Sequence, residues 1–208
     1  MGGNHELVFY HMPGTRSSDV LRLLEALKAP YQLKLLNLKQ GKQKDPSYLA
    51  INPMGKVPAI VHGDAVVTEV IAIYIYLADL FPEAKLAPAI SDSGRGTYLR
   101  WLVYYAGCFE PALMDYSLKR EPAPRASCPY GNYATVIKTI EGQLAKGAYI
   151  AGESFTAADV LWGSALAWAV ETQLVASSAS IAAYIERVNE KPYFAAAKAK
   201  DEQLLASA

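Results

Sequence analysis

The stretch NPMGKVPAIVHGDAVVTEV, residues 52–70, carries most of the information about the first part of this chain. Two β-prone runs, Lys56–Val61 and Ala65–Val67, flank His62–Gly63–Asp64, which is typical of a hairpin turn. The apolar run that follows, TEVIAIYIYLADLFP, has the length of a helix and ends at Pro82. The stretch therefore predicts an antiparallel hairpin followed by a helix.

The dipeptide Val57–Pro58 stands where the first strand of this hairpin begins. Proline removes one ladder hydrogen bond, and only an X-Pro bond adopts the cis form at a cost as low as about 0.5–1 kcal/mol. A cis bond would leave the backbone N–H and C=O of Val57 at a sheet edge, where they could pair with the backbone of a small peptide. The alternative is an ordinary turn proline.

Thr68 and Glu69 open the predicted helix. The first N–H groups of a helix have no acceptor within it and attract a carboxylate, while Glu69 supplies a negative charge for an ammonium group. Such a site suits the head group of an α-amino acid, which carries both charges. The alternative is that Glu69 only interacts favourably with the helix dipole.

The residues before this stretch predict a strand, a helix and a second strand. Glu6–His11 is β-prone, Pro13–Gly14 ends it, and TRSSDVLRLLEALKAP places its leucines at helical spacing. Tyr31–Leu38 partly alternates as a strand and leads into a polar loop. The predicted order is β-α-β-loop-β-β-α.

The second half of the chain is predicted to be helical. Residues 83–96 are rich in Pro, Gly and Ser and predict a linker between a domain at 1–82 and a domain at 97–208. A long helix with a kink at Pro111 comes first, and a helix over Tyr133–Leu144 follows. In GESFTAADVLWGSALAW, Thr156 and Asp159 have the spacing of a capping box. The fold class is thus an α/β domain followed by an all-α helical bundle.

The composition of the chain limits the classes of partner and the cellular setting that we expect. Twenty basic and twenty acidic residues give a net charge of zero without runs of like charge, which argues against nucleic acid or a membrane surface as partner. Two cysteines, Cys108 and Cys128, and no N-terminal export signal predict a reducing, cytoplasmic setting. Three scattered histidines and two distant cysteines do not form a metal-ligand set.

Together, NPMGKVPAI before the hairpin, TEVIAIYIYLADLFP after it and the capped helix of the second half resemble the cytosolic glutathione transferases, most closely bacterial members. The resemblance implies a thioredoxin-like first domain that binds glutathione as co-substrate, without metal. It also implies a homodimer that conjugates the glutathione thiolate to small apolar electrophiles held against the helical domain. Two alternatives are a glutathione-binding protein with little catalysis and a protein-interaction module of the same fold.

The resemblance also implies binding residues. Val57 would hold the cysteinyl backbone of glutathione, Glu69 and Val70 its γ-glutamyl end, and Lys44 its glycyl carboxylate. A serine commonly follows the glutamate in this family, so Val70 removes one hydroxyl hydrogen bond. The complete implied set is Gln43, Lys44, Lys56, Val57, Pro58, Glu69 and Val70.

Catalysis requires a donor that stabilises the glutathione thiolate, because the thiolate is the nucleophile. Relatives place a serine four residues before the arginine that matches Arg16, and this chain has Met12 there. Candidate replacements are Thr15, Ser17 and Tyr10, although Thr15 could be only a helix cap and Tyr10 only a core residue. His11 is a further candidate, although a lone histidine beside the end of a strand is a weak signal. The predicted electrophile pocket comprises Met12, Tyr105, Cys108 and Tyr116, whose aromatic members could instead be core.

Overall fold

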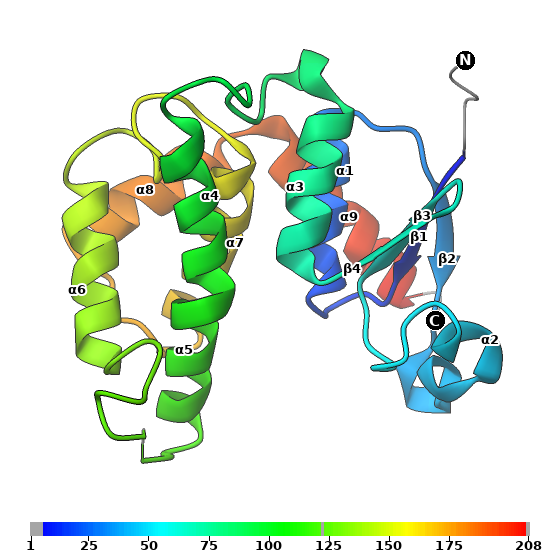
Figure 1. The fold of residues 1–208 in the computed structure, drawn as a ribbon, viewed down its shortest axis with the longest axis horizontal. Coiled ribbons are helices and arrows are strands. Elements are labelled where there is room, and N and C mark those ends of the chain that lie inside the picture. The colour runs from blue at the N-terminus through cyan, green and yellow to red at the C-terminus, as the bar shows by residue number, and fades with distance from the viewer. Residues whose placement is uncertain (1–5, 122, 207–208) are drawn as a thin grey trace. The chain divides into compact units, whose positions relative to one another are not determined.

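A computed structural model describes residues 6–121 and 123–206 (Figure 1). The contacts among these residues divide the chain into two compact units. The first unit comprises residues 6–84 and 192–206, and the second comprises residues 85–191. Each unit is described by itself below.

The first unit is built on a four-stranded sheet in the order β2-β1-β3-β4. The central strand β1 (Leu7–His11) pairs in parallel with β2 (Gln32–Leu35) and antiparallel with β3 (Ala59–His62), which forms a hairpin with β4 (Ala65–Thr68). Gly63, at φ +59°, supplies the left-handed conformation that the tight turn of the hairpin needs. The sheet is therefore mixed, and the predicted hairpin and thioredoxin-like domain are confirmed.

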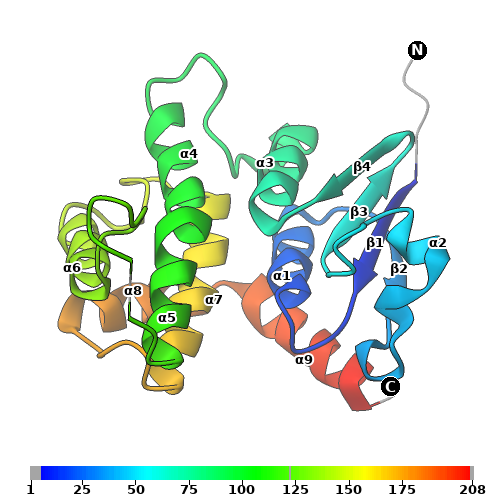
Figure 2. The ribbon, with the colours of Figure 1, turned by 60° about the horizontal axis from the view of Figure 1, so that its bottom comes forward.

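Helices of the first unit lie beside this sheet. Helices α1 (Ser17–Leu27) and α3 (Val70–Leu80) pack against each other, and in both views they lie on the same side of the sheet (Figures 1 and 2). The short α2 (Pro46–Leu49) follows the polar loop after β2. Alternation along β1 turns Phe9 into the core and Tyr10 to the opposite, half-buried face.

The last helix, α9 (Pro192–Ala206), packs along α1 (Figure 2). The Arg22 guanidinium lies 5.4 Å from the ring centre of Phe194, and Lys200 Nζ lies 3.0 Å from a Glu25 carboxylate oxygen. The sequence predicts one helical domain over residues 97–208, whereas the contacts of α9 place it in the first unit, with the sheet. The reason is that its partners lie in and around α1, far away in the sequence, and no local sequence pattern indicates them.

The second unit is helical, and its first long helix is interrupted. Helix α4 (Arg95–Tyr104) passes into a π-helical segment, Tyr105–Phe109, before α5 (Glu110–Ser117). The N–H of Glu110 donates to the carbonyl of Tyr105, five residues back. Pro111 has no N–H to donate to the preceding turn, so the change of register comes just before it. The expected kink at Pro111 is therefore a π-helical segment ahead of the proline.

The other helices of this unit are α6 (Tyr133–Leu144), α7 (Ala157–Glu171) and α8 (Ala179–Asn189). The bounds of α6 are those predicted from the sequence, and Asn132 caps it by accepting from the N–H of Thr135 at 2.8 Å. Helix α7 begins with the predicted capping box of Thr156 and Asp159 and is buried over most of its length. It forms the centre of the helical core.

The Asp159 carboxylate is fully buried at the start of α7. It accepts hydrogen bonds from the N–H groups of Ile150 and Thr156, at 2.8 and 2.9 Å, and from the hydroxyls of Thr156 and Tyr184, at 3.1 and 2.9 Å. Burial raises the pKa of this carboxyl to about 6, although all four hydrogen bonds act in the opposite direction. Asp159 thus joins three segments of the helical core.

Candidate functional site

Glu69 connects the sheet to α3 in a backbone conformation of positive φ, with φ +66° and ψ 123°. A residue other than glycine rarely adopts positive φ, and such positions cluster at functional sites. Thr68 ends β4 and α3 begins at Val70, so the helix starts two residues later than predicted. Glu69 is exposed, and the N–H groups of the first turn of α3 have no acceptor within the helix. A carboxylate and a helix N-terminus therefore lie side by side.

The Val57–Pro58 peptide bond is cis. Val57 is half-buried and lies outside the strand ladder, whose register begins at Ala59. The preceding carbonyl, that of Lys56, accepts from the Tyr48 hydroxyl at 2.6 Å and from the Asn52 side-chain amide at 2.8 Å. These two hydrogen bonds fix the loop in which Val57 presents its backbone.

The loop that carries Gln43 and Lys44 packs against the loop before Val57. A side-chain Cβ at Gly55 would lie 3.0 Å from the Gln43 carbonyl oxygen, and Gly55 has φ +61°, so only glycine allows this close approach. Gln43 Oε1 is buried and has no hydrogen-bond partner among the described residues, while Lys44 is exposed. The structure thus brings Gln43 next to the loop of Lys56 and Val57.

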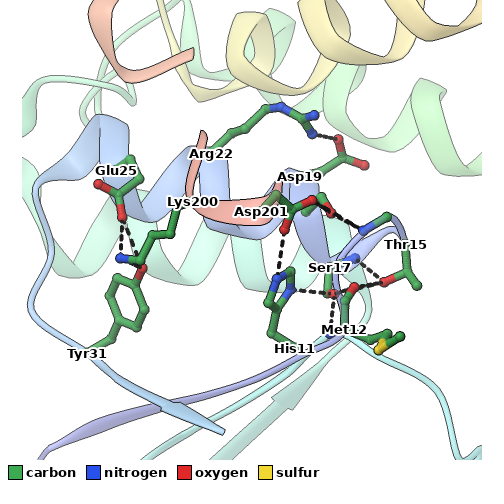
Figure 3. A network of polar contacts seen from close by, with 12 residues as sticks. His11, Met12, Thr15, Ser17, Asp19, Arg22, Glu25, Tyr31, Lys200 and Asp201 are labelled. Atoms are coloured by element: carbon green, nitrogen blue, oxygen red, sulfur yellow. Dashed lines mark hydrogen bonds and ion pairs between the residues drawn. The ribbon is translucent and has the colours of Figure 1, made fainter. Parts of the chain in front are cut away.

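The turn between β1 and α1 contains two of the three candidate hydroxyls (Figure 3). The Thr15 hydroxyl donates to the Met12 carbonyl at 2.7 Å and lies 2.8 Å from Ser17 Oγ. Ser17 is fully buried, accepts from the Met12 N–H at 3.0 Å and lies 2.7 Å from His11 Nδ1. Thr15 remains half-buried, whereas burial leaves Ser17 no surface for a ligand.

Tyr10, the third candidate, lies away from the other two. Its ring centre is 5.4 Å from that of Tyr48, and both line a hollow of about 370 Å³ beside β2 and α2. Because side chains alternate along a strand, Tyr10 faces the side opposite to its buried neighbour His11. In the sequence, the alternation of side chains along the strand at β1 could have indicated that Tyr10 faces away from the turn.

The predicted electrophile residues have different surroundings. Met12 is buried in the first unit, with 7% of its surface exposed. In the second unit Tyr105 is 1% exposed and packs on Phe109 and Trp162, which makes it a core residue. Tyr116 is exposed and stacks on Tyr133, with ring centres 4.1 Å apart.

Cys108 is half-buried in the π-helical segment. Burial, and secondarily the neighbouring Cys128, raises the pKa of its thiol. A raised pKa keeps the thiol protonated near neutral pH, so Cys108 is poorly suited to act as a nucleophile itself.

His11 and Asp201 complete the surroundings of the turn. His11 is a further candidate from the sequence, but no sequence pattern indicates that it pairs with Asp201. His11 Nε2 lies 2.8 Å from Asp201 Oδ1, and the side chain of His11 is fully buried. The two residues are 190 positions apart, so no local signal connects them.

Among residues 6–121 and 123–206, no group of three or more His, Cys, Asp or Glu residues is arranged to hold a metal ion. Over the same residues, no helix has both the length and the apolar character to span a membrane.

Comparison with known families matches both units. Residues 5–79 match the family "Glutathione S-transferase, N-terminal domain", and residues 131–192 match "Glutathione S-transferase, C-terminal domain". Glutathione S-transferase 3 of Zea mays is 31% identical over 167 residues, which are 74% of this chain and 73% of the maize protein. Glutathione S-transferase F10 of Arabidopsis thaliana is 32% identical over 137 residues, 60% of this chain and 63% of that protein.

A bacterial crystal structure is also similar over nearly the whole chain. It is a glutathione transferase homolog from Sulfitobacter with bound glutathione, 26% identical, with a TM-score of 0.71 over 94% of this chain and 98% of that one. The sheet order, the cis-proline loop and the capped helix of the second unit agree with these matches. The chain belongs to the cytosolic glutathione transferase family.

Proposed function

We propose that this protein is a glutathione transferase that adds the glutathione thiolate to small, apolar electrophiles in the cytoplasm. The observation that carries the proposal is the exposed Glu69, held at positive φ beside the N-terminus of α3. A fold does not keep a strained, exposed acidic residue for packing, and this one suits the ammonium of a γ-glutamyl group. The solved Sulfitobacter relative, which holds glutathione, supports the same ligand.

The proposed binding mode uses three segments of the first unit. The backbone of Val57, after Lys56 and beside Pro58, pairs with the cysteinyl residue of glutathione, as an added strand would. Glu69 and the N–H of Val70 bind the γ-glutamyl ammonium and carboxylate. The loop of Gln43 and Lys44 binds the glycyl carboxylate. These are the contacts implied by the resemblance, and the packing of the Gln43 loop against Gly55 supports them.

In this proposal, the turn between β1 and α1 stabilises the glutathione thiolate. Lowering a thiol pKa by about 2 units takes about 2.7 kcal/mol of differential stabilisation. We assign this to backbone N–H groups of the turn at Thr15–Ser17 and to the N-terminus of α1, helped by the Thr15 hydroxyl. Ser17 acts through Thr15, because its own hydroxyl is buried. Tyr10 is the remaining alternative.

Replacing Thr15 by valine is expected to raise the apparent pKa of bound glutathione by about half a unit to one unit, because the turn loses the hydrogen bond from the Thr15 hydroxyl to the Met12 carbonyl that helps to orient its N–H groups. Affinity should stay near normal, since the contacts at both ends of the tripeptide remain. Met12→Ser, which restores the hydroxyl that relatives carry, should lower the pKa or leave it unchanged. Thiolate absorbance followed against pH measures both. An unshifted curve in Thr15→Val would remove Thr15 from the mechanism, and a rise seen only in Tyr10→Phe would assign the role to Tyr10.

The rival function is a glutathione-binding protein with little catalysis, which Met12 and Val70 favour because both replace hydroxyl residues of relatives. The deciding experiment combines retention on immobilised glutathione with turnover of an aryl halide, an epoxide, an isothiocyanate and a peroxide. Retention with turnover of any of them supports the transferase. Retention without turnover supports the rival, and no retention supports a protein-interaction module.

We further propose a homodimer, as the family resemblance implies. Helix α3 and β4 present an apolar hollow of about 620 Å³, lined by Val67, Ala72, Ile75, Tyr76, Asp79 and Leu80. Zero net charge gives two copies little electrostatic reason to stay apart. Sedimentation at micromolar concentration should give twice the chain mass of 22.6 kDa. Ile75→Glu, which places a charge in the hollow, should give monomers, and a monomeric wild-type protein would contradict the proposal.

A further inference from the structure

Asp201 of α9 holds the turn that precedes α1 (Figure 3). Its Oδ2 accepts from the Ser18 hydroxyl at 2.5 Å and from the Gly14 N–H at 3.2 Å, and its Oδ1 lies 2.8 Å from His11 Nε2. The side chain of Asp201 is 15% exposed and that of His11 is not exposed at all. One carboxylate from the end of the chain therefore has three partners in or beside this turn.

His11 lies between this carboxylate and the residues behind the turn. Its Nδ1 lies 2.7 Å from Ser17 Oγ, and that oxygen accepts from the Met12 N–H at 3.0 Å and lies 2.8 Å from Thr15 Oγ1. Contacts of Asp201 therefore extend through His11 to Ser17, where α1 begins.

Without the carboxylate, the Ser18 hydroxyl would lose its acceptor and the Gly14 N–H would lose one of its two acceptors. The His11 ring would also lose its neighbour at Nε2. Gly14 and Ser18 flank Thr15–Ser17, so the orientation of the N–H groups of these three residues depends on the same carboxylate.

We propose that Asp201 is a positioning residue for the bound thiolate: through His11, Ser18 and Gly14 it fixes the donors of the turn that face the sulfur of glutathione. This inference rests on the proposed function of the first unit. It assigns a role in the reaction to the C-terminal helix, which touches neither the sulfur nor the electrophile in this proposal.

Because of the charges around Asp201, the direction in which the pKa of bound glutathione changes is informative. Burial by itself would raise the pKa of Asp201, but hydrogen bonds from His11, Ser18 and Gly14 bring it below its ordinary value, so the carboxyl is ionised at neutral pH. The other charged side chains nearby on α1 and α9 are paired, Asp19 with Arg22 at 2.9 Å and Glu25 with Lys200 at 3.0 Å. As a remote negative charge alone, Asp201 would disfavour a thiolate, and its removal would lower the thiol pKa.

The test is Asp201→Asn, with Lys200→Met as the matched control on the same helix. Lys200 ties α9 to Glu25 and to the Tyr31 hydroxyl, at 3.0 and 2.6 Å, without touching the turn. In Asp201→Asn the pKa of bound glutathione should rise by about half a unit to one unit, while affinity for S-methylglutathione, which forms no thiolate, stays within about twofold. Lys200→Met should loosen the packing of α9 without changing the pKa of bound glutathione.

An unchanged or lowered pKa in Asp201→Asn would overturn the proposal, and so would an equal rise in Lys200→Met, which would assign the effect to helix docking in general. His11→Gln gives an independent test, because it removes the ring that lies between Asp201 and Ser17; it should raise the pKa in the same direction. Failure of the proposed function has a different signature: the thiol bound to the wild-type protein would titrate like free glutathione.

Discussion

Asp159→Ala is expected to lower the free energy of unfolding of the helical unit by at least about 3 kcal/mol, because the buried N–H groups of Ile150 and Thr156 are left without an acceptor at a cost of at least about 1 kcal/mol each, and a lost helix cap costs about 1 kcal/mol. Four donors, from Ile150, Thr156 and Tyr184, converge on this carboxylate. Urea unfolding followed by circular dichroism measures the loss.

The matched control is Glu171→Ala at the exposed end of the same helix, which should change stability by at most about 0.5 kcal/mol.

The loss of stability caused by Asp159→Ala should also depend on pH. Since burial raises the folded pKa from 3.8 to about 6, the folded state binds more protons between these values. The stabilisation that Asp159 contributes is fully present below pH 3.8 and is lost as the pH rises through about 6. The substitution should therefore cost more at about pH 5 than at about pH 7. A loss below about 1 kcal/mol at both values would contradict the role of Asp159.

Glu69→Ala is expected to weaken glutathione binding by about 1.5–3 kcal/mol, the range for hydrogen bonds to charged groups. This corresponds to a rise in Kd of about 10- to 150-fold. The reason is that the carboxylate is the charge proposed to bind the γ-glutamyl ammonium. Calorimetric titration of the folded variant with glutathione measures the change directly.

Two further variants separate binding from folding at this position. Glu83→Ala removes another exposed carboxylate of the same unit and should leave Kd unchanged. Glu69→Gly should lose the same affinity as Glu69→Ala and yet be more stable than it, because glycine adopts the φ of +66° without steric cost. Wild-type affinity in a folded Glu69→Ala protein would show that the γ-glutamyl end binds elsewhere.

The parts of the fold that local signals determine could be predicted from the sequence. The bounds of α6 follow from its apolar spacing, and the Thr156–Asp159 capping box carries its own hydrogen-bond partners three residues apart. The hairpin of β3 and β4 follows from Gly63 and the alternating strands beside it. In each case the residues that define the structure are close in sequence.

The environment of the turn before α1 could not be predicted, because it depends on contacts between distant residues. Thr15 and Ser17 were proposed as hydroxyls that face glutathione, but Ser17 is buried on His11, which is itself fixed by Asp201. Helix α9 has too few large apolar residues to indicate what it packs against, and its Ala-rich face suits the close approach to α1. The position of Tyr10 was available from strand alternation, which places it opposite to its neighbours.

The decisive observation is the ionisation of the glutathione thiol in the wild-type complex, measured by thiolate absorbance as a function of pH against free glutathione under the same conditions. If the turn before α1 stabilises the thiolate, the bound thiol should titrate about 2 units below the value near 8.5 of an unperturbed thiol. A curve for the complex that coincides with that of free glutathione, with binding demonstrated at the same time, would contradict the transferase mechanism and favour a glutathione-binding protein.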